Sequence, residues 1–152
     1  MSDINYKAKS GKKCVFSQYD CFTGKIKNDI FSLPADYDWI YEQLITPDGK
    51  YLIISSRPFQ VLVYDLTTLK LIKSTKVFSA NPYVLKLQSN NSVSFLIDGT
   101  VYLWNFISGD LQETKLSSET VNDYCFSKDK KDVIYCQNKS EKIIQMNLAT
   151  GK

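Results

Sequence analysis

The sequence Trp104-Asn105-Phe106-Ile107-Ser108-Gly109-Asp110 decides how the rest of the chain is interpreted, because its pattern occurs three more times. Each copy has a large apolar or aromatic residue, then Asp or Asn, then an apolar residue, then a short turn. The other copies are residues 19–25, 64–70 and 146–152. Successive copies begin 45, 40 and 42 residues apart. This spacing indicates that the chain repeats one supersecondary unit.

The second residue of each copy explains why a turn follows it. Short Asp and Asn side chains accept hydrogen bonds from the backbone two residues on, which starts a turn. Three copies have Gly at the sixth position, where hairpin turns often need a positive φ angle. The second copy has Leu69 there, so the sequence predicts either a different turn or a strained one at this position.

Runs rich in β-branched and aromatic residues precede each copy, and a more polar run follows it. Continuous apolar runs such as Tyr51–Ile54 and Val61–Tyr64 predict inner strands that are covered on both faces. Residues 39–75 and 83–116 each fit four strands, whereas residues 1–31 and 121–152 fit three. No segment has helical periodicity, so the sequence predicts an all-β chain of about fourteen strands.

Two further motifs resemble those of the WD-repeat family. Thr46-Pro47-Asp48-Gly49 resembles the family's Ser-Pro-Asp-Gly turn, and Asp98–Asn105 resembles its Asp-Gly-Thr-Val-x-Leu-Trp-Asp segment. The chain departs from the family pattern because it has no histidine and because only one copy begins with Trp. The resemblance covers nearly the whole chain and implies a WD-like β-propeller, with about 3.5 four-stranded antiparallel blades in this chain. A generic propeller of the YVTN type is the near alternative.

The length of 152 residues fits one domain, and we expect residues 1–152 to form a single propeller segment. Closed propellers have at least about four blades, so the partial blades at 1–31 and 121–152 need an explanation. Either further repeats of a longer protein complete the ring, or another chain completes it. We favour the first explanation, because repeat arrays need capped ends.

The composition favours a folded chain without a strong charge. Apolar residues make up 43% of it, and the formal net charge is +3. No apolar run approaches the roughly 20 residues of a membrane helix, so we expect no membrane insertion and an intracellular, cytoplasmic location.

The spacing of the cysteines fits neither a zinc site nor a disulfide scaffold, so we expect buried, reduced thiols. These cysteines are Cys14, Cys21, Cys125 and Cys136, of which the last two could face each other across a hairpin.

The residue types argue against catalysis and against nucleic-acid binding. Without histidine the chain cannot hold a Ser-His-Asp or Cys-His arrangement, and no glycine-rich phosphate motif occurs. We therefore expect no catalytic residues, no metal and no cofactor. Lysines cluster at positions 7–13 and 128–131, but Arg57 is the only arginine, so we do not expect specific nucleic-acid binding.

Other proteins are the expected partners. In a WD-like ring, the resemblance implies that loops between blades and loops between the second and third strands line one rim. Aromatic residues and arginine anchor protein interfaces. Such residues on the expected rim are Tyr37, Arg57, Phe59 and Phe78, with Asp36, Asn81 and residues 138–142 beside them. Arg57-Pro58-Phe59 is the best single candidate, although packing of Phe59 on a neighbouring blade would explain it equally well.

The sequence therefore predicts a non-catalytic scaffold for protein–protein interactions, as a subunit or part of a larger assembly. The alternative is a propeller enzyme of the lactonase or dehydrogenase kind, with a metal or cofactor over the central channel. A third hypothesis is a structural element that neighbouring chains hold in place. A stoichiometric metal ion would favour the enzyme, whereas a sharply melting monomer would count against the third hypothesis.

Overall fold

The protein is built from β-strands joined by turns and loops. The structure, a computed structural model, describes residues 4–7, 15–20, 22–32, 39–138 and 142–152. This part of the chain contains fourteen strands and no helix. The strands form four antiparallel sheets, and in each sheet neighbouring strands are also consecutive in the chain. The prediction of an all-β chain with a repeated sheet is thus confirmed.

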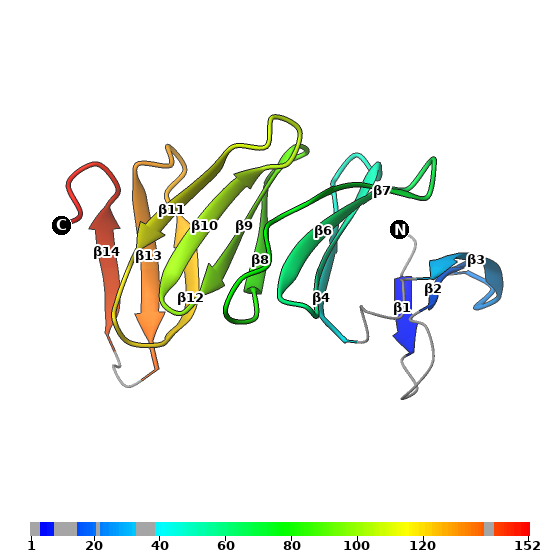
Figure 1. Ribbon diagram of the computed structural model, residues 1–152, viewed down its shortest axis with the longest axis horizontal. Coiled ribbons are helices and arrows are strands. Elements are labelled where there is room, and N and C mark those ends of the chain that lie inside the picture. The colour runs from blue at the N-terminus through cyan, green and yellow to red at the C-terminus, as the bar shows by residue number, and fades with distance from the viewer. Residues whose placement is uncertain (1–3, 8–14, 21, 33–38, 139–141) are drawn as a thin grey trace. The chain divides into compact units, whose positions relative to one another are not determined.

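Two compact units divide the chain, at Met1–Asn81 and Pro82–Lys152. Each unit contains one three-stranded and one four-stranded sheet (Figure 1). The strands of the first unit are β1 (Ile4–Lys7), β2 (Val15–Tyr19), β3 (Ile26–Ser32), β4 (Ile40–Ile45), β5 (Tyr51–Ser56), β6 (Gln60–Asp65) and β7 (Lys70–Ser74). Those of the second unit are β8 (Tyr83–Ser89), β9 (Ser92–Ile97), β10 (Thr100–Asn105), β11 (Leu111–Lys115), β12 (Val121–Phe126), β13 (Asp132–Gln137) and β14 (Ile143–Asn147).

The middle strands of the β4–β7 sheet are buried along almost their whole length. Residues 52–56 of β5 and 61–64 of β6 are all buried. Successive residues of a strand point to opposite faces, so both faces of these strands are covered. The continuous apolar runs in the sequence predicted this burial. The outer strand β7 differs, because all five of its residues are exposed.

The second unit has a core between its two sheets. Leu96 and Val101 of the β8–β11 sheet pack with Val121, Tyr124 and other buried residues of the β12–β14 sheet. The hydroxyl of Tyr83 adds a cross-sheet hydrogen bond of 3.0 Å to the Val121 backbone oxygen. One face of the β12–β14 sheet is therefore covered within this unit.

All four copies of the seven-residue pattern form the same turn. The side-chain oxygen of the second residue accepts backbone N–H groups from the fourth and fifth residues, at 2.7–3.2 Å. The backbone oxygen of the second residue accepts the N–H of the sixth, at 2.8 Å in every copy. The second residues are Asp20, Asp65, Asn105 and Asn147.

Leu69 forms this turn in the same way as the glycines of the other copies. Its φ angle is 59°, whereas Gly24, Gly109 and Gly151 have φ angles of 65°, 90° and 68°. A positive φ angle is unfavourable for a residue with a β-carbon, by roughly 1–2 kcal/mol. Of the two outcomes expected for Leu69, the structure therefore has the strained turn.

A second turn occurs in both units. In the first unit the Thr46 hydroxyl lies 2.6 Å from Asp48 Oδ1 and accepts the Tyr51 N–H at 3.0 Å. In the second unit Ser127 and Asp129 make the equivalent contact at 2.7 Å, and Ser127 accepts the Asp132 N–H at 3.0 Å. The sequence motif beginning at Thr46 therefore has a second, less obvious copy that begins at Ser127.

Candidate partner-binding surface

The residues predicted to bind a partner have different environments. Arg57 is exposed, Phe59 is half-buried, and Phe78 is buried with 8% of its surface accessible. Tyr37 lies outside the described residues, as does Asp36. Among the further rim residues, Asn81 is half-buried and Asn138 is exposed, while residues 139–141 are also outside the described part.

Backbone contacts bring three of the aromatic residues to one end of the β4–β7 sheet. The Phe78 N–H donates to the Phe59 backbone oxygen at 3.0 Å, and the Arg57 N–H donates to the Trp39 backbone oxygen at 3.0 Å. Arg57 is thereby held next to Trp39, and Phe59 next to Phe78. The structure thus brings two of the predicted loop residues, Arg57 and Phe59, to the same end of the sheet as Trp39, which the sequence predicted as the first residue of a strand.

Trp39 is the functional candidate that the sequence analysis missed. It immediately precedes β4, and 58% of its surface is exposed. Val77 is 56% exposed and lies next to Phe78 in the chain. These backbone hydrogen bonds and the chain neighbours of the bonded residues define a group at one end of the β4–β7 sheet, which we call the Trp39 patch: Trp39, Arg57, Pro58, Phe59 and Val77. The only signal in the sequence was that Trp39 stands at the start of a predicted strand. A side chain at this position can stay exposed, because the rest of the protein need not cover the end of a strand.

The segment after β7 is fastened to the start of β6 by Thr75. The Thr75 hydroxyl accepts the Val61 N–H at 3.0 Å, and its backbone oxygen accepts the Gln60 side-chain amide at 2.9 Å. Thr75 also donates its own N–H to the Val61 oxygen at 3.0 Å. These bonds fix the path of residues 75–78, so the exposure of Val77 is imposed by the backbone.

The composition of the Trp39 patch suits binding better than chemistry. It contains no carboxylate, thiol or hydroxyl group that could transfer a proton or attack a substrate. Tryptophan and arginine are among the residues that most often dominate protein interfaces. The ammonium group of Lys76, 5.6 Å from the centre of the Phe78 ring, adds a cation beside the patch.

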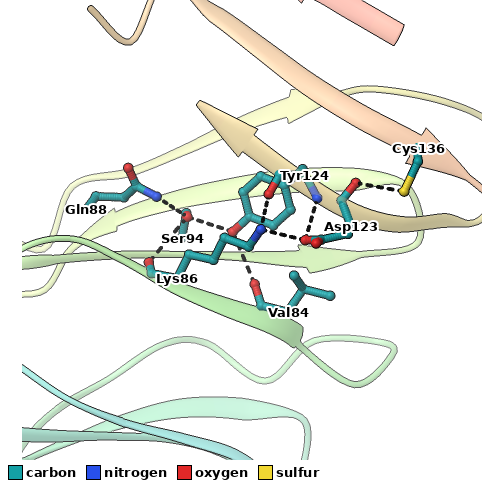
Figure 2. Close-up of polar contacts among 7 residues, drawn as sticks. All are labelled: Val84, Lys86, Gln88, Ser94, Asp123, Tyr124 and Cys136. Carbon is teal, nitrogen blue, oxygen red and sulfur yellow. Dashed lines mark hydrogen bonds and ion pairs between the residues drawn. The ribbon is translucent and has the colours of Figure 1, made fainter. Parts of the chain in front are cut away.

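A polar cluster in the second unit also needs an interpretation (Figure 2). Tyr124 is buried, and its hydroxyl lies 2.6 Å from Ser94 Oγ and 3.2 Å from the Val84 backbone oxygen. Lys86 Nζ lies 2.5 Å from Asp123 Oδ1, donates to the Tyr124 backbone oxygen, and lies 5.1 Å from the Tyr124 ring centre. The cluster therefore joins β8 and β9 to β12.

The electrostatics of this cluster favour a structural role. Partial burial raises the pKa of Asp123, but hydrogen bonds from the Lys86 ammonium and the Tyr124 N–H lower it by more, so the pKa lies below its usual value. The carboxylate is thus ionised and paired with the lysine. Because the charged groups and the tyrosine hydroxyl already have partners, the cluster fastens the two sheets together.

A shallow apolar cavity of about 220 Å³ lies beside this cluster, lined by Cys125, Ile134, Cys136 and Ile143 among others. Both cysteines are free thiols, but Cys125 is exposed and Cys136 is half-buried, so the expectation of buried thiols is wrong for this pair. They lie on the sheet face opposite the core of the unit. Cys125 opposes Ile134 and Cys136 opposes Asp123 in the strand register, so the two thiols do not face each other directly. Cys14 and Cys21 lie outside the described residues.

Two further features are absent from the described ranges. Among these residues, no three Cys, Asp or Glu side chains are grouped closely enough to hold a metal ion. No described segment forms a helix with the length and apolar character needed to cross a membrane.

Comparison with known proteins adds no family to this description. No protein-family model matches the chain, and no curated protein matches it at a significant level.

Proposed function

We propose that this protein is a non-catalytic scaffold for protein–protein interactions, built on a WD-like propeller, and that the Trp39 patch contacts its partner. The observation that carries the proposal is the 58% exposure of Trp39 beside the exposed Arg57. A tryptophan side chain buries roughly 150–250 Å² when it is covered, and exposing so much apolar surface costs stability. A partner that covers Trp39 would recover this free energy.

The repeated architecture supports the scaffold part of the proposal. Four antiparallel sheets share one strand order, and a copy of the same turn follows β2, β6, β10 and β14. Such repeats stack into propellers and present their loops as a continuous surface. In the proposed assembly, further repeats or another chain complete the ring. Free thiols at Cys125 and Cys136 favour a reducing compartment such as the cytoplasm.

The proposal can be tested by affinity capture with the full chain. Trp39→Ser and Arg57→Ser should each abolish the recovery of a protein that the unchanged chain captures from lysate. Ile107→Ser is the matched control, because Ile107 is 51% exposed and belongs to the turn that follows β10. Circular dichroism on each variant would verify that it is folded.

Two results would contradict the proposal. Equal capture by all variants would show that the Trp39 patch is not the binding surface. A stoichiometric metal ion in the purified protein would favour the propeller-enzyme hypothesis over the scaffold.

A further inference from the structure

Strand β7 carries exposed apolar side chains at a sheet edge. It is the last strand in the order of the β4–β7 sheet, and no other strand of the described chain pairs with its outer side. Leu71 and Ile72 are 44% and 40% exposed. The chain then leads through Thr75 to Val77, which belongs to the Trp39 patch. Two exposed apolar residues of β7 and one of the Trp39 patch thus lie within seven positions of the chain, with Lys73, Ser74, Thr75 and Lys76 between them.

The same stretch is strongly cationic. Lys73 and Lys76 are exposed on it, and Arg57 lies at its end beside Trp39. We call these three cations, together with Leu71, Ile72 and Val77, the basic strip. No Asp or Glu occurs between residues 66 and 81. Within the part of the chain that the structure describes, no ion pair neutralises the cations of the strip.

The nearest carboxylate in the sequence is already engaged. Asp65 lies opposite Lys70 in the strand register, at the other end of β7 from Val77. Its Oδ1 atom accepts the backbone N–H groups of Thr67 and Thr68 at 2.8 and 2.7 Å. The positive charge around Lys73 and Lys76 is therefore left for a partner to neutralise.

The equivalent edge of the other four-stranded sheet lacks this combination. Strand β11 has the sequence Leu-Gln-Glu-Thr-Lys, so its charges have both signs. Its only large apolar residue, Leu111, is half-buried. Both strands occupy the same position in their sheets. The cationic and apolar character of β7 is therefore not required by the repeated fold.

Protection of a sheet edge explains only part of the basic strip. Lysines and bulges on an edge strand discourage pairing with another chain. Strand β7 has both, because the register with β6 shifts between Val63 and Tyr64. Protection needs only the lysines and the bulge, so it gives no reason for Leu71, Ile72 and Val77 to be exposed on the same short stretch of chain.

The geometry points to an acidic, extended peptide segment of a partner protein as the ligand of the basic strip. Its carboxylates pair with Arg57, Lys73 and Lys76, and its apolar side chains cover Leu71, Ile72 and Val77. The register shift limits backbone pairing, so recognition depends mainly on side chains. This inference rests on the proposed function, because the strip includes part of the Trp39 patch, and it names the chemistry of the partner.

A fluorescent peptide in which Glu alternates with Val tests the inference by fluorescence anisotropy with the full chain. The peptide should bind, more weakly as salt is added, and a peptide in which Lys alternates with Val should not. Lys73→Glu combined with Lys76→Glu should weaken binding about tenfold. Leu71→Ser combined with Val77→Ser should also weaken it, although this variant keeps every charge.

The control variant combines Lys25→Glu with Lys128→Glu, which changes the net charge equally at exposed positions outside the strip. It should bind the Glu–Val peptide like the unchanged chain. An equal loss in this control, or unchanged binding in both strip variants, would overturn the inference. A single-stranded oligonucleotide that binds more tightly than the peptide would overturn it too, since the strip would then be a nucleic-acid surface.

The outcome also separates this inference from the scaffold proposal. If the Glu–Val peptide does not bind while capture still depends on Trp39, the scaffold proposal stands and the acidic partner is rejected. If the peptide binds through the strip while capture is independent of Trp39, the strip stands and the Trp39 patch is rejected as the general binding surface.

Discussion

The β4–β7 and β8–β11 sheets have the same strand order and the same closing turn, but they differ at their outer strands. In both, a side-chain oxygen of Asp65 or Asn105 holds two backbone N–H groups. Yet β7 is exposed, cationic and apolar, whereas β11 is of mixed charge and partly buried. The repeat therefore specifies the turn and the inner strands, while the exposure and charge of the outer strand vary between the sheets.

The two sheets also differ in how much space surrounds their turn glycines. Gly99, between β9 and β10, is buried against the chain that follows β11. Gly49, between β4 and β5, has no atom near the place where a β-carbon would lie. Both have similar positive φ angles of 71° and 70°. An alanine at Gly49 would have only the unfavourable φ angle, whereas an alanine at Gly99 would also collide with backbone oxygens. Comparing the two variants therefore separates these two costs in stability.

Gly99→Ala should have the largest effect on stability. Its β-carbon would lie 2.5 Å from the Ser117 oxygen and 2.8 Å from the Glu119 oxygen, closer than such atoms approach. We expect a loss of about 3 kcal/mol in the free energy of unfolding, measured by urea denaturation. Gly49→Ala is the control and should lose only about 1 kcal/mol, from the φ angle alone. Equal losses would show that the contacts around Gly99 relax without cost.

Substitutions at the sixth residue of the closing turn should change the free energy of unfolding by less, and in opposite directions in the two sheets. Leu69→Gly should raise the free energy of unfolding by about 0.5–1 kcal/mol, because it relieves the positive φ angle of an exposed leucine. Gly109→Leu should lower it by about 1–2 kcal/mol for the same reason. Urea denaturation of both variants would measure the pair. A stability loss in Leu69→Gly would mean that the leucine side chain contributes more by packing than its backbone costs.

Substitutions at the second residue of the turn should have the smallest effect on stability, and this effect should appear only at acid pH. The backbone hydrogen bond from Thr68 is the main cause that holds the pKa of Asp65 below 3.8. Because the folded state lowers this pKa, Asp65 stabilises the protein above pH 3.8 and loses that contribution as the pH falls through its folded pKa. Asn105 does not titrate, so the equivalent turn of the other sheet should be insensitive.

Asp65→Asn should therefore make the stability slightly less dependent on pH in the acid range, and Asn105→Asp should make it slightly more dependent. Thermal melts near neutral pH and below pH 3.8 would measure the difference. The pKa values of Asp48 and Asp129 are also lowered, by hydrogen bonds from Thr46 and Ser127, so other acid sensitivity remains in both variants. An unchanged pH profile in both variants would contradict the role of the Asp65 carboxylate.

Much of the fold was predictable because its determinants are local in sequence. The closing turn needs an acceptor side chain and a residue with positive φ within seven positions, and all four copies contain both. The continuous apolar runs at 51–54 and 61–64 likewise predicted doubly covered strands. Even so, the backbone conformation at Leu69 could not be predicted, because the sequence does not show whether the turn tolerates a leucine with a positive φ angle.

The candidate site was less predictable because exposure depends on distant contacts. Phe78 was expected on an exposed rim. Its N–H instead donates to the Phe59 backbone oxygen, and its side chain is buried. Trp39 was expected to be the first residue of a strand, yet it precedes β4 and is exposed. Cys125 was expected to be buried, but it lies on the face of the β12–β14 sheet that is opposite the core of the unit. None of these outcomes follows from the neighbouring residues in the chain.

The closing turn has a consequence for the history of such a chain. Each copy carries its own bend within a few residues, and no copy depends on another for that bend. Gene duplication could therefore add or remove whole units without breaking any hairpin. Substitutions elsewhere could then accumulate until little but the bend identified the copies as relatives, as Met146 in place of an aromatic residue illustrates.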